Sequence, residues 1–355
     1  FISAHGISED VINAYVQATK VALQTEKDRE YGLKVSNRAK KIVNQFIFDK
    51  TGGTPWDLEK FSFEHKTYYD ILNTYYDILL CEAQNQVVDS GFMYLERKRE
   101  PKERFYMPRR KQFLKIGLTQ ALQGMIDDEY DILLMSLIPG AGKTTIEKFF
   151  LCLVIGWFPK DFNLFYSHSG DITRMFYDGT LDIVTNADDY SWKDIFPDLS
   201  VTRTDAKMEQ FNVSKYKPFP SVQCTSVGSK NAGKVRASKF LLVDDMIGGI
   251  EEALNPNVLD KLWDKYAVDA RQRKVQDTDG NNCKEIHIAT RWSVNDVIGR
   301  IQRMYEGNKR VKVISVPDVD ENGESNFDYE FGGFTKEFFE DQQLLMDDIS
   351  YRCLY

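Results

Sequence analysis

The sequence of 355 residues has little of what metal clusters and disulfide frameworks require. It contains four histidines and five cysteines, and the cysteines are scattered along the chain with no Cys-x-x-Cys pair. These counts indicate neither a zinc cluster nor a set of disulfide bonds, and they favour a reducing compartment. The longest apolar run, residues 149–158, is about half the length that a membrane-spanning helix needs. We therefore expect no membrane partner.

The sequence also lacks an excess of positive charge, because its net charge is −8 at pH 7. A protein with this charge cannot bind nucleic acid over its whole surface, so any such contact needs local basic patches. Three patches occur, at residues 97–115, 230–239 and 261–274. They would hold phosphates without reading bases, although each is also compatible with an ordinary solvated face. An apolar content of 42% allows a large core, spread over two or three compact units.

The most informative segment is residues 132–145, where an apolar strand gives way to a Pro/Gly turn and then to the start of a helix. The N–H groups of such a turn and the helix macrodipole converge on one place, where Lys143 adds charge for the β- and γ-phosphates and the Thr144 hydroxyl can ligate Mg²⁺. The pattern predicts a P-loop, although Leu137 replaces its usual first glycine and an ordinary strand-to-helix turn is the alternative. The residues expected around the phosphates are Pro139, Gly140, Ala141, Gly142, Lys143, Thr144 and Thr145.

A second segment, residues 240–245, is an apolar strand that ends in two acids. Asp244 is placed to hold Mg²⁺, and Asp245 to orient or deprotonate the water that attacks the γ-phosphate. Many ATPases have glutamate at the second position, and aspartate is one methylene shorter. The alternative is a strand that simply runs into a turn.

A third segment, residues 285–300, is a strand ending in Thr290-Arg291-Trp292 before an amphipathic helix that contains Asp296. Together with the two segments above, it resembles the ATPase domain of the large terminase subunit, the DNA-packaging motor of tailed bacteriophages. The resemblance covers roughly residues 105–355. It implies that Thr290 and Arg291 sense the γ-phosphate and couple hydrolysis to DNA movement, whereas in isolation they would be a strand-end threonine and a surface arginine.

Residues 105–112 lie upstream of the P-loop, where the resemblance places an adenine-recognising motif. Gln112 can offer a donor and an acceptor to the adenine edge, and Tyr106 or Arg109 could stack on the base. The resemblance therefore implies ATP, with Mg²⁺, as the bound cofactor. An exposed polar helix start is the alternative interpretation.

Residues 227–237 form a Gly- and Ser-rich basic loop just before the Asp-Asp strand. The loop resembles the segment through which terminases contribute an arginine finger to a neighbouring subunit. Arg236 is our first candidate for that finger, and Lys234 is the second. A solvated basic loop is the alternative.

The alternation of strands and helices after residue 131 predicts an α/β fold with a mostly parallel sheet covered by helices on both faces. Ligands bind beyond the carboxyl ends of such strands, where Lys143, Asp244 and Arg291 fall. His168 lies at another strand end and is interpreted as a polar residue outside the site, an approach to the nucleotide being the alternative. The resemblance implies an ASCE-type P-loop NTPase. The expected strands are 131–137, 163–167, 240–243, 285–289 and 310–315, and the expected helices are 144–156, 170–186, 251–273 and 294–306.

Three regions follow from these patterns. Residues 1–100 are expected to be a helical region of unknown role, with apolar helical spacing between residues 7 and 90, and residues 101–330 to be the P-loop ATPase domain. Residues 331–355 are expected to form a C-terminal lid or linker helix. We expect the natural protein to continue beyond Tyr355 into a nuclease domain, so this chain should not cut DNA by itself.

The function expected from the resemblance is an ATP-hydrolysing motor that moves double-stranded DNA into a procapsid. The implied partners are the portal protein, the small terminase subunit and further copies of this chain in a ring. The implied location is the cytoplasm of the infected bacterial host, at the procapsid portal. Two other functions remain open from the motifs: a superfamily-2-type nucleic-acid helicase, and a regulatory module that binds nucleotide without turnover.

Overall fold

The computed structural model describes residues 8–25, 29–62, 69–214, 217–229 and 235–355. The chain divides into two compact units, the first comprising residues 1–107 and 188–196 and the second residues 108–187 and 197–355. The sequence predicts a boundary near residue 100, and it gives no sign that residues 188–196 belong with the first unit. No helix in the described ranges is long and apolar enough to cross a membrane.

The first unit is built of helices, with apolar side chains at helical spacing. On the second of them Val43 and Ile47 lie one turn apart, and both belong to a buried cluster with Ile12 and Ile78 from neighbouring helices. The helices are α2 (Glu9–Thr25), α3 (Arg29–Thr51), α4 (Pro55–Ser62), α5 (Tyr69–Gln84), α6 (Val88–Leu95), η1 (Pro101–Glu103) and α11 (Trp192–Ile195).

Two arginines of the predicted basic patch at residues 97–115 make their contacts inside the first unit. Arg104 is only 2% exposed, and its guanidinium donates to Glu59 at 2.7 Å and to the hydroxyl of Tyr76 at 3.0 Å. Arg97 lies over the ring of Tyr76, 4.7 Å from its centroid. Both side chains therefore contact residues of the first unit. Because Arg104 is buried, the prediction that this patch contacts nucleic-acid phosphates is wrong for Arg104.

The second unit contains an eight-stranded sheet in the order β3-β4-β5-β2-β6-β7-β1-β8. Neighbouring strands from β5 to β8 are parallel, and β3, β4 and β5 are joined antiparallel. β7 therefore lies between β1 and β6. The strands are β1 (Ile132–Ser136), β2 (Asn163–Ser167), β3 (Val201–Asp205), β4 (Gln210–Val213), β5 (Val222–Ser226), β6 (Phe240–Asp244), β7 (Lys284–Ala289) and β8 (Val311–Ser315).

The five predicted strands correspond to β1, β2, β6, β7 and β8, and the mixed α/β class is confirmed. The prediction omits β3, β4 and β5. The middle of β3 is exposed and reads Thr-Arg-Thr, so it has no apolar alternation from which a strand could be recognised. These three strands place antiparallel pairs beside an otherwise parallel sheet.

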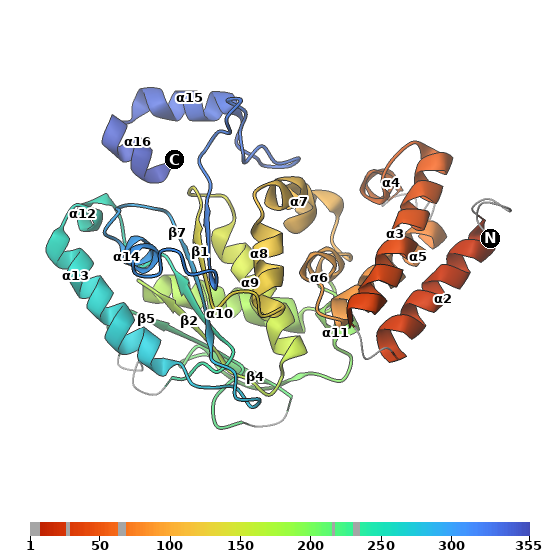
Figure 1. Ribbon diagram of the computed structural model, residues 1–355, viewed down its shortest axis with the longest axis horizontal. Helices are drawn as coiled ribbons and strands as arrows, with labels where there is room; N and C mark the ends of the chain where they lie inside the picture. The colour runs from red at the N-terminus through yellow and green to blue at the C-terminus, as the bar shows by residue number, and fades with distance from the viewer. Residues whose placement is uncertain (1–7, 26–28, 63–68, 215–216, 230–234) are drawn as a thin grey trace. The chain divides into compact units, whose positions relative to one another are not determined.

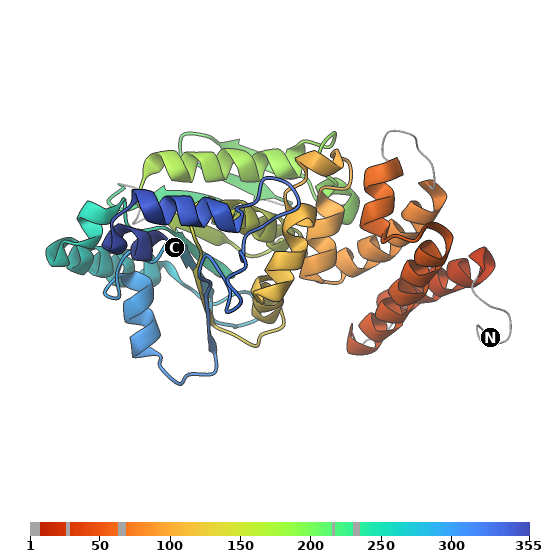
Figure 2. The same cartoon turned by 90° about the horizontal axis from the view of Figure 1, so that it is seen from above.

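Helices cover both faces of the sheet (Figures 1 and 2). On one face, Val297, Ile298 and Ile301 of α14 pack against strand residues that include Leu134 and Leu241. On the other face, Phe150 of α9 meets Phe240 at a centroid distance of 5.2 Å. Burying each such side chain contributes about 1.5–3 kcal/mol. The helices are α7 (Tyr106–Lys115), α8 (Leu118–Ile126), α9 (Lys143–Trp157), α10 (Gly170–Thr185), α12 (Ile250–Ala253), α13 (Pro256–Asp264), η3 (Lys265–Ala270), η4 (Arg271–Arg273) and α14 (Val297–Met304).

The C-terminal segment forms two helices, α15 (Lys336–Leu345) and α16 (Asp348–Leu354), where the sequence predicts one. Asp347 explains the correction, because its carboxylate accepts hydrogen bonds from the N–H groups of Ile349 and Ser350 and so begins a new helix. α16 returns toward the sheet unit, where Cys353 Sγ lies 3.3 Å from the carbonyl oxygen of Trp292.

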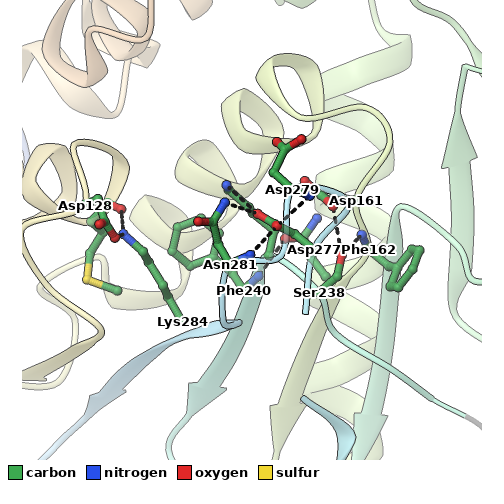
Figure 3. A network of polar contacts seen from close by, with 12 residues as sticks. Asp128, Asp161, Phe162, Ser238, Phe240, Asp277, Asp279, Asn281 and Lys284 are labelled. Carbon is green, nitrogen blue, oxygen red and sulfur yellow. Dashed lines mark hydrogen bonds and ion pairs between the residues drawn. The ribbon is translucent and has the colours of Figure 1, made fainter. Parts of the chain in front are cut away.

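Polar contacts hold the edge of the sheet at which the parallel strands begin (Figure 3). Ser238 donates to Asp161 at 3.1 Å and accepts from the N–H of Phe162 at 3.0 Å, which ties the approach to β6 to the approach to β2. Lys284, at the start of β7, forms an ion pair with Asp128 at 2.9 Å. These contacts lie at the beginnings of strands whose opposite ends carry the predicted catalytic groups.

Candidate nucleotide-binding site

The predicted P-loop connects the carboxyl end of β1 to the first residue of α9. Gly140 and Gly142 have φ angles of 77° and 93°, in the left-handed region that glycine adopts without strain. A Cβ atom on Gly140 would also lie 2.7 Å from the ring of Phe334. α9 begins at Lys143, and the first N–H groups of a helix have no partner within the helix. The local geometry is therefore that of an anion-binding helix N-terminus.

Lys143 points back into the loop. Its Nζ donates to Thr290 Oγ1 at 2.6 Å and to the carbonyl oxygens of Leu137 and Ile138 at 3.2 and 3.3 Å. Burial lowers the pKa of Lys143, and the nearby Asp245 and Asp244 oppose that effect. The ammonium group is thus held between the loop and the end of β7, the strand beside β1.

Thr144 joins the loop to the end of β6. Its hydroxyl donates to Asp244 Oδ2 at 2.6 Å, and Asp244 is only 2% exposed. Burial raises the pKa of Asp244, while the bond from Thr144 and the charge of Lys143 lower it. A hydroxyl and a carboxylate are oxygen donors of the kind that Mg²⁺ prefers, and Mg²⁺ commonly takes one or two carboxylates together with substrate phosphates. The residues present therefore fit Mg²⁺ bound with a nucleotide.

Within the described ranges, no group of three or more His, Cys, Asp or Glu side chains could hold a metal ion. A site that depends on phosphate oxygens to complete the coordination of Mg²⁺ does not require such a group.

Asp245 follows Asp244 in an unusual backbone conformation, with a φ of 39°. Its N–H donates to the carbonyl of Ile288 on β7 at 2.9 Å, and its own carbonyl lies 2.7 Å from Nδ1 of His168. Its carboxyl oxygen Oδ1 is buried and has no hydrogen-bond partner among the described residues. Burial raises the pKa of Asp245 to about 6, against the opposing charge of Lys143. A buried carboxylate with a pKa near neutrality is suited to accept a proton.

The two residues at the end of β7 face different groups. Thr290 is buried and contacts Lys143, as given above. Arg291 is drawn toward α14, where its Nε lies 3.1 Å from Asp296 and its Nη1 donates to Gln302 at 3.2 Å. Asp296 also accepts from the N–H of Gly299 and caps the helix. The structure thus brings Thr290 to the P-loop and pairs Arg291 with α14.

The predicted adenine-recognising residues contact a later segment of the chain. Gln112 Nε2 donates to the carbonyl of Asp328. The guanidinium of Arg109 lies 4.7 Å from the ring centroid of Tyr329, and the Tyr329 hydroxyl donates to the carbonyl of Ala141 in the P-loop at 3.1 Å. Tyr329 therefore links α7 to the loop, and sequence reasoning did not identify it.

An open cavity of about 590 Å³ lies between α7 and residues 324–337. Gln112, Asp328 and Lys336 are among the side chains that line it. Tyr106 does not contribute, because it is fully buried in the first unit, where its hydroxyl donates to Asp89 at 2.8 Å. The interpretation of Tyr106 as a base-stacking residue is therefore wrong.

Arg236 lies away from the P-loop of its own chain. It precedes β6, whose other end carries Asp244, and its Nη1 donates to the carbonyl of Val235 at 2.8 Å. A five-residue strand is about 16 Å long, so Arg236 lies at the opposite edge of the sheet from the P-loop. The second candidate, Lys234, falls outside the described residues.

Two further residues near the site were not recognised as part of it. Glu147 lies one turn after Thr144 on α9, is 1% exposed, and has no hydrogen-bond partner for either carboxyl oxygen among the described residues. Burial raises the pKa of Glu147 well above its usual value. A sequence signal existed, since an acid interrupts the apolar face of this helix. His168 is the second of these residues. Like the predicted site residues, it lies at the carboxyl end of a strand, β2.

The sequence matches no protein-family model and no curated protein. Among solved structures, the chain is similar to an arginine-to-alanine mutant of the large terminase ATPase domain of a Thermus phage. The sequence identity is 10% and the TM-score 0.45, with 66% of this chain and 91% of that chain covered. The function is therefore inferred from the residues of the site.

Proposed function

We propose that this chain is the ATPase motor of a large terminase subunit, which hydrolyses ATP with Mg²⁺ to move double-stranded DNA into a procapsid. The observation that carries the proposal is that the P-loop is bonded to two other strand ends. Lys143 reaches Thr290 at the end of β7, and Thr144 reaches Asp244 at the end of β6. Motifs far apart in the sequence thus meet at the carboxyl ends of β1, β6 and β7, where open α/β sheets bind ligands.

In the proposed site, the N–H groups at the start of α9 and the Lys143 ammonium bind the β- and γ-phosphates. Thr144 and Asp244 would hold Mg²⁺, which when bound neutralises charge that develops on the phosphate oxygens. Thr145, Pro139 and Ala141 complete the loop around the phosphates. Catalysis at the proposed site would come from positioning and charge, since phosphoryl transfer needs little covalent chemistry from the protein.

Asp245 is the proposed base for the attacking water. Its carboxyl group is buried, and no described residue hydrogen-bonds to Oδ1, so that oxygen is available to a water molecule. The carboxylate would orient the water and accept one of its protons while the water oxygen attacks the γ-phosphorus. The bond from the γ-phosphorus to the bridging oxygen would break in the same displacement, and ADP would leave. Thr290 would contact the γ-phosphate beside Lys143, and Arg291 would do so after leaving Asp296. Gln112, which lines the cavity beside α7, would contact the adenine edge, and Arg109 of the same helix would stack on the base.

Steady-state ATPase measurements on the purified chain, with and without linear double-stranded DNA, test the proposal. We expect turnover that DNA stimulates and that Lys143→Ala abolishes, because this variant removes the charge on the phosphates. ATP binding with no turnover would instead indicate the regulatory module. Unwinding of a forked duplex would indicate the helicase.

We also propose that the active form is a ring in which Arg236 serves the site of a neighbouring copy. Its position before β6, at the edge of the sheet opposite the P-loop of its own chain, supports this. A mixture of Arg236→Ala and Lys143→Ala chains should recover ATPase activity, since some interfaces then combine an intact loop with an intact arginine. A mixture of Arg291→Ala and Lys143→Ala should not recover, and equal failure of both mixtures would contradict the assignment. The portal protein and the small terminase subunit are the further partners that this function requires.

A further inference from the structure

His168 lies directly after β2, at the same edge of the sheet as the P-loop. β2 pairs in parallel with β6, and Ser167 is the partner of Asp244 in that register. His168 directly follows β2 and Asp245 directly follows β6, so these two residues are also neighbours. The pairing of two strands that are distant in the sequence places the imidazole beside the proposed base.

The contact between the two residues has a defined direction. Nδ1 of His168 lies 2.7 Å from the main-chain carbonyl oxygen of Asp245. A carbonyl oxygen can only accept, so Nδ1 carries the proton and donates it. In the neutral imidazole, Nε2 is then left as an acceptor.

This bond acts on a backbone that is held in an unfavourable conformation. Asp245 has a φ of 39°, in the left-handed region that residues with a Cβ atom rarely occupy. Such conformations persist only where surrounding contacts impose them. Two contacts do so here: the Asp245 N–H donates to Ile288 at 2.9 Å, and the Asp245 carbonyl accepts from His168.

The orientation of the Asp245 carboxyl group consequently depends on its backbone. Oδ1 is buried and has no hydrogen-bond partner among the described residues, so no polar contact on that atom aims the group. If the carbonyl were released, the residue could return to an ordinary φ, and the carboxyl would turn away from its present position.

We infer that His168 is a positioning residue of the ATPase site, which holds Asp245 so that its carboxylate faces the attacking water. The inference rests on the proposed function, in which Asp245 activates that water. His168 touches the main chain of Asp245 and takes no proton in the reaction. It should therefore affect turnover and leave nucleotide affinity unchanged.

The test compares three variants of the full chain. His168→Leu removes the donor, and His168→Asn retains an N–H donor close to the place of Nδ1. Ser169→Ala is the matched control, because Ser169 is the next residue and its hydroxyl caps α10 by accepting from the N–H of Ile172. For each variant, kcat and KM for ATP are measured together with the Kd of a fluorescent ATP analogue and the melting temperature.

We expect His168→Leu to lower kcat about tenfold or more with the analogue's Kd unchanged, since small misplacements of catalytic groups cost large factors in rate. His168→Asn should restore most of the turnover. Ser169→Ala should lower the melting temperature and leave kcat unchanged. If the wild-type chain hydrolyses ATP and His168→Leu does so equally well, or if Asn fails where Leu fails, the inference is wrong. If the wild-type chain binds but does not hydrolyse ATP, the proposed function fails first.

Discussion

Lys143 of the predicted P-loop donates a 2.6 Å hydrogen bond to Thr290, which directly follows the adjacent strand β7 and is far away in the sequence. The ammonium is otherwise bound by two carbonyl oxygens of the loop itself. The Thr290 hydroxyl is thus the contact through which the end of β7 meets the lysine that we propose binds phosphate. A change in the position of one residue must alter the surroundings of the other.

Replacing Thr290 by valine tests this relationship. The variant keeps the shape of the side chain but removes the hydroxyl that lies beside Lys143. We expect kcat to fall by about tenfold to a hundredfold, the scale on which losing one preorganised polar group slows an enzyme. Thr290→Ser retains the hydroxyl and should retain turnover. Steady-state kinetics of both variants provide the measurement, and a serine variant as slow as the valine variant would contradict the role of the hydroxyl.

Asp245→Asn should leave ATP binding nearly intact and reduce turnover about a hundredfold or more, because the amide cannot accept a proton. In the wild-type chain the carboxylate must be ionised to act as a base. Since burial raises the pKa of Asp245 to about 6, kcat should fall as the pH decreases through about 6. The residual activity of Asp245→Asn should show no such decrease. A pH–rate profile of both proteins measures this, and identical profiles would remove Asp245 from the mechanism.

Thr144→Ala should raise the Mg²⁺ concentration needed for half-maximal ATPase activity. The variant deletes one proposed ligand and also leaves the buried Asp244 without the bond that it accepts at 2.6 Å. Removing an oriented ligand or its partner commonly costs about tenfold to a hundredfold in metal affinity. Thr144→Ser keeps the hydroxyl and should behave as the wild type. A Mg²⁺ titration at saturating ATP distinguishes the two, and an unchanged half-maximal concentration in the alanine variant would argue against Thr144 as a ligand.

Glu147→Gln should stabilise the nucleotide-free protein at neutral and alkaline pH. The buried carboxyl has a raised pKa, so the folded chain holds a proton that the unfolded chain releases. Its contribution to stability is full below the usual pKa of 4.5 and is lost as the pH rises toward the folded value. We expect a melting temperature about 2 °C or more above wild type at pH 8, and a smaller difference at pH 5. A larger gain at pH 5 than at pH 8 would show that the carboxyl is not buried in this way.

The part of the site that sequence could predict consists of residues inside contiguous motifs. Lys143 and Thr144 follow an apolar strand directly, and Asp244 ends one, so the rule that parallel strands end at a common edge was sufficient to bring them together. These predictions depend only on local strand signals and on the alternation of strands with helices. The role of Thr290 was instead implied by the resemblance of residues 285–300 to the terminase ATPase domain.

The remaining contacts depend on pairings that no local signal reports. His168 meets Asp245 because β2 is the neighbour of β6, and strand order cannot be read from strand positions alone. Arg291 pairs with Asp296 and Gln302 at the helix that follows it, and the motif does not predict these contacts. The strands β3 to β5 were missed because each has only four or five residues, and β3 also has an exposed polar middle without an apolar period.

Tyr329 and Phe334 cover one side of the predicted P-loop, and neither residue belongs to a nucleotide-binding motif. The hydroxyl of Tyr329 bonds to Ala141, and the ring of Phe334 fills the space above Gly140 that a side chain would otherwise occupy. A fragment that stopped after β8 would retain all the motif residues and yet expose the loop on this side. We therefore expect the smallest fragment with the proposed ATPase activity to extend past β8 and include both aromatic residues, so that a fragment designed from the motifs alone would be too short.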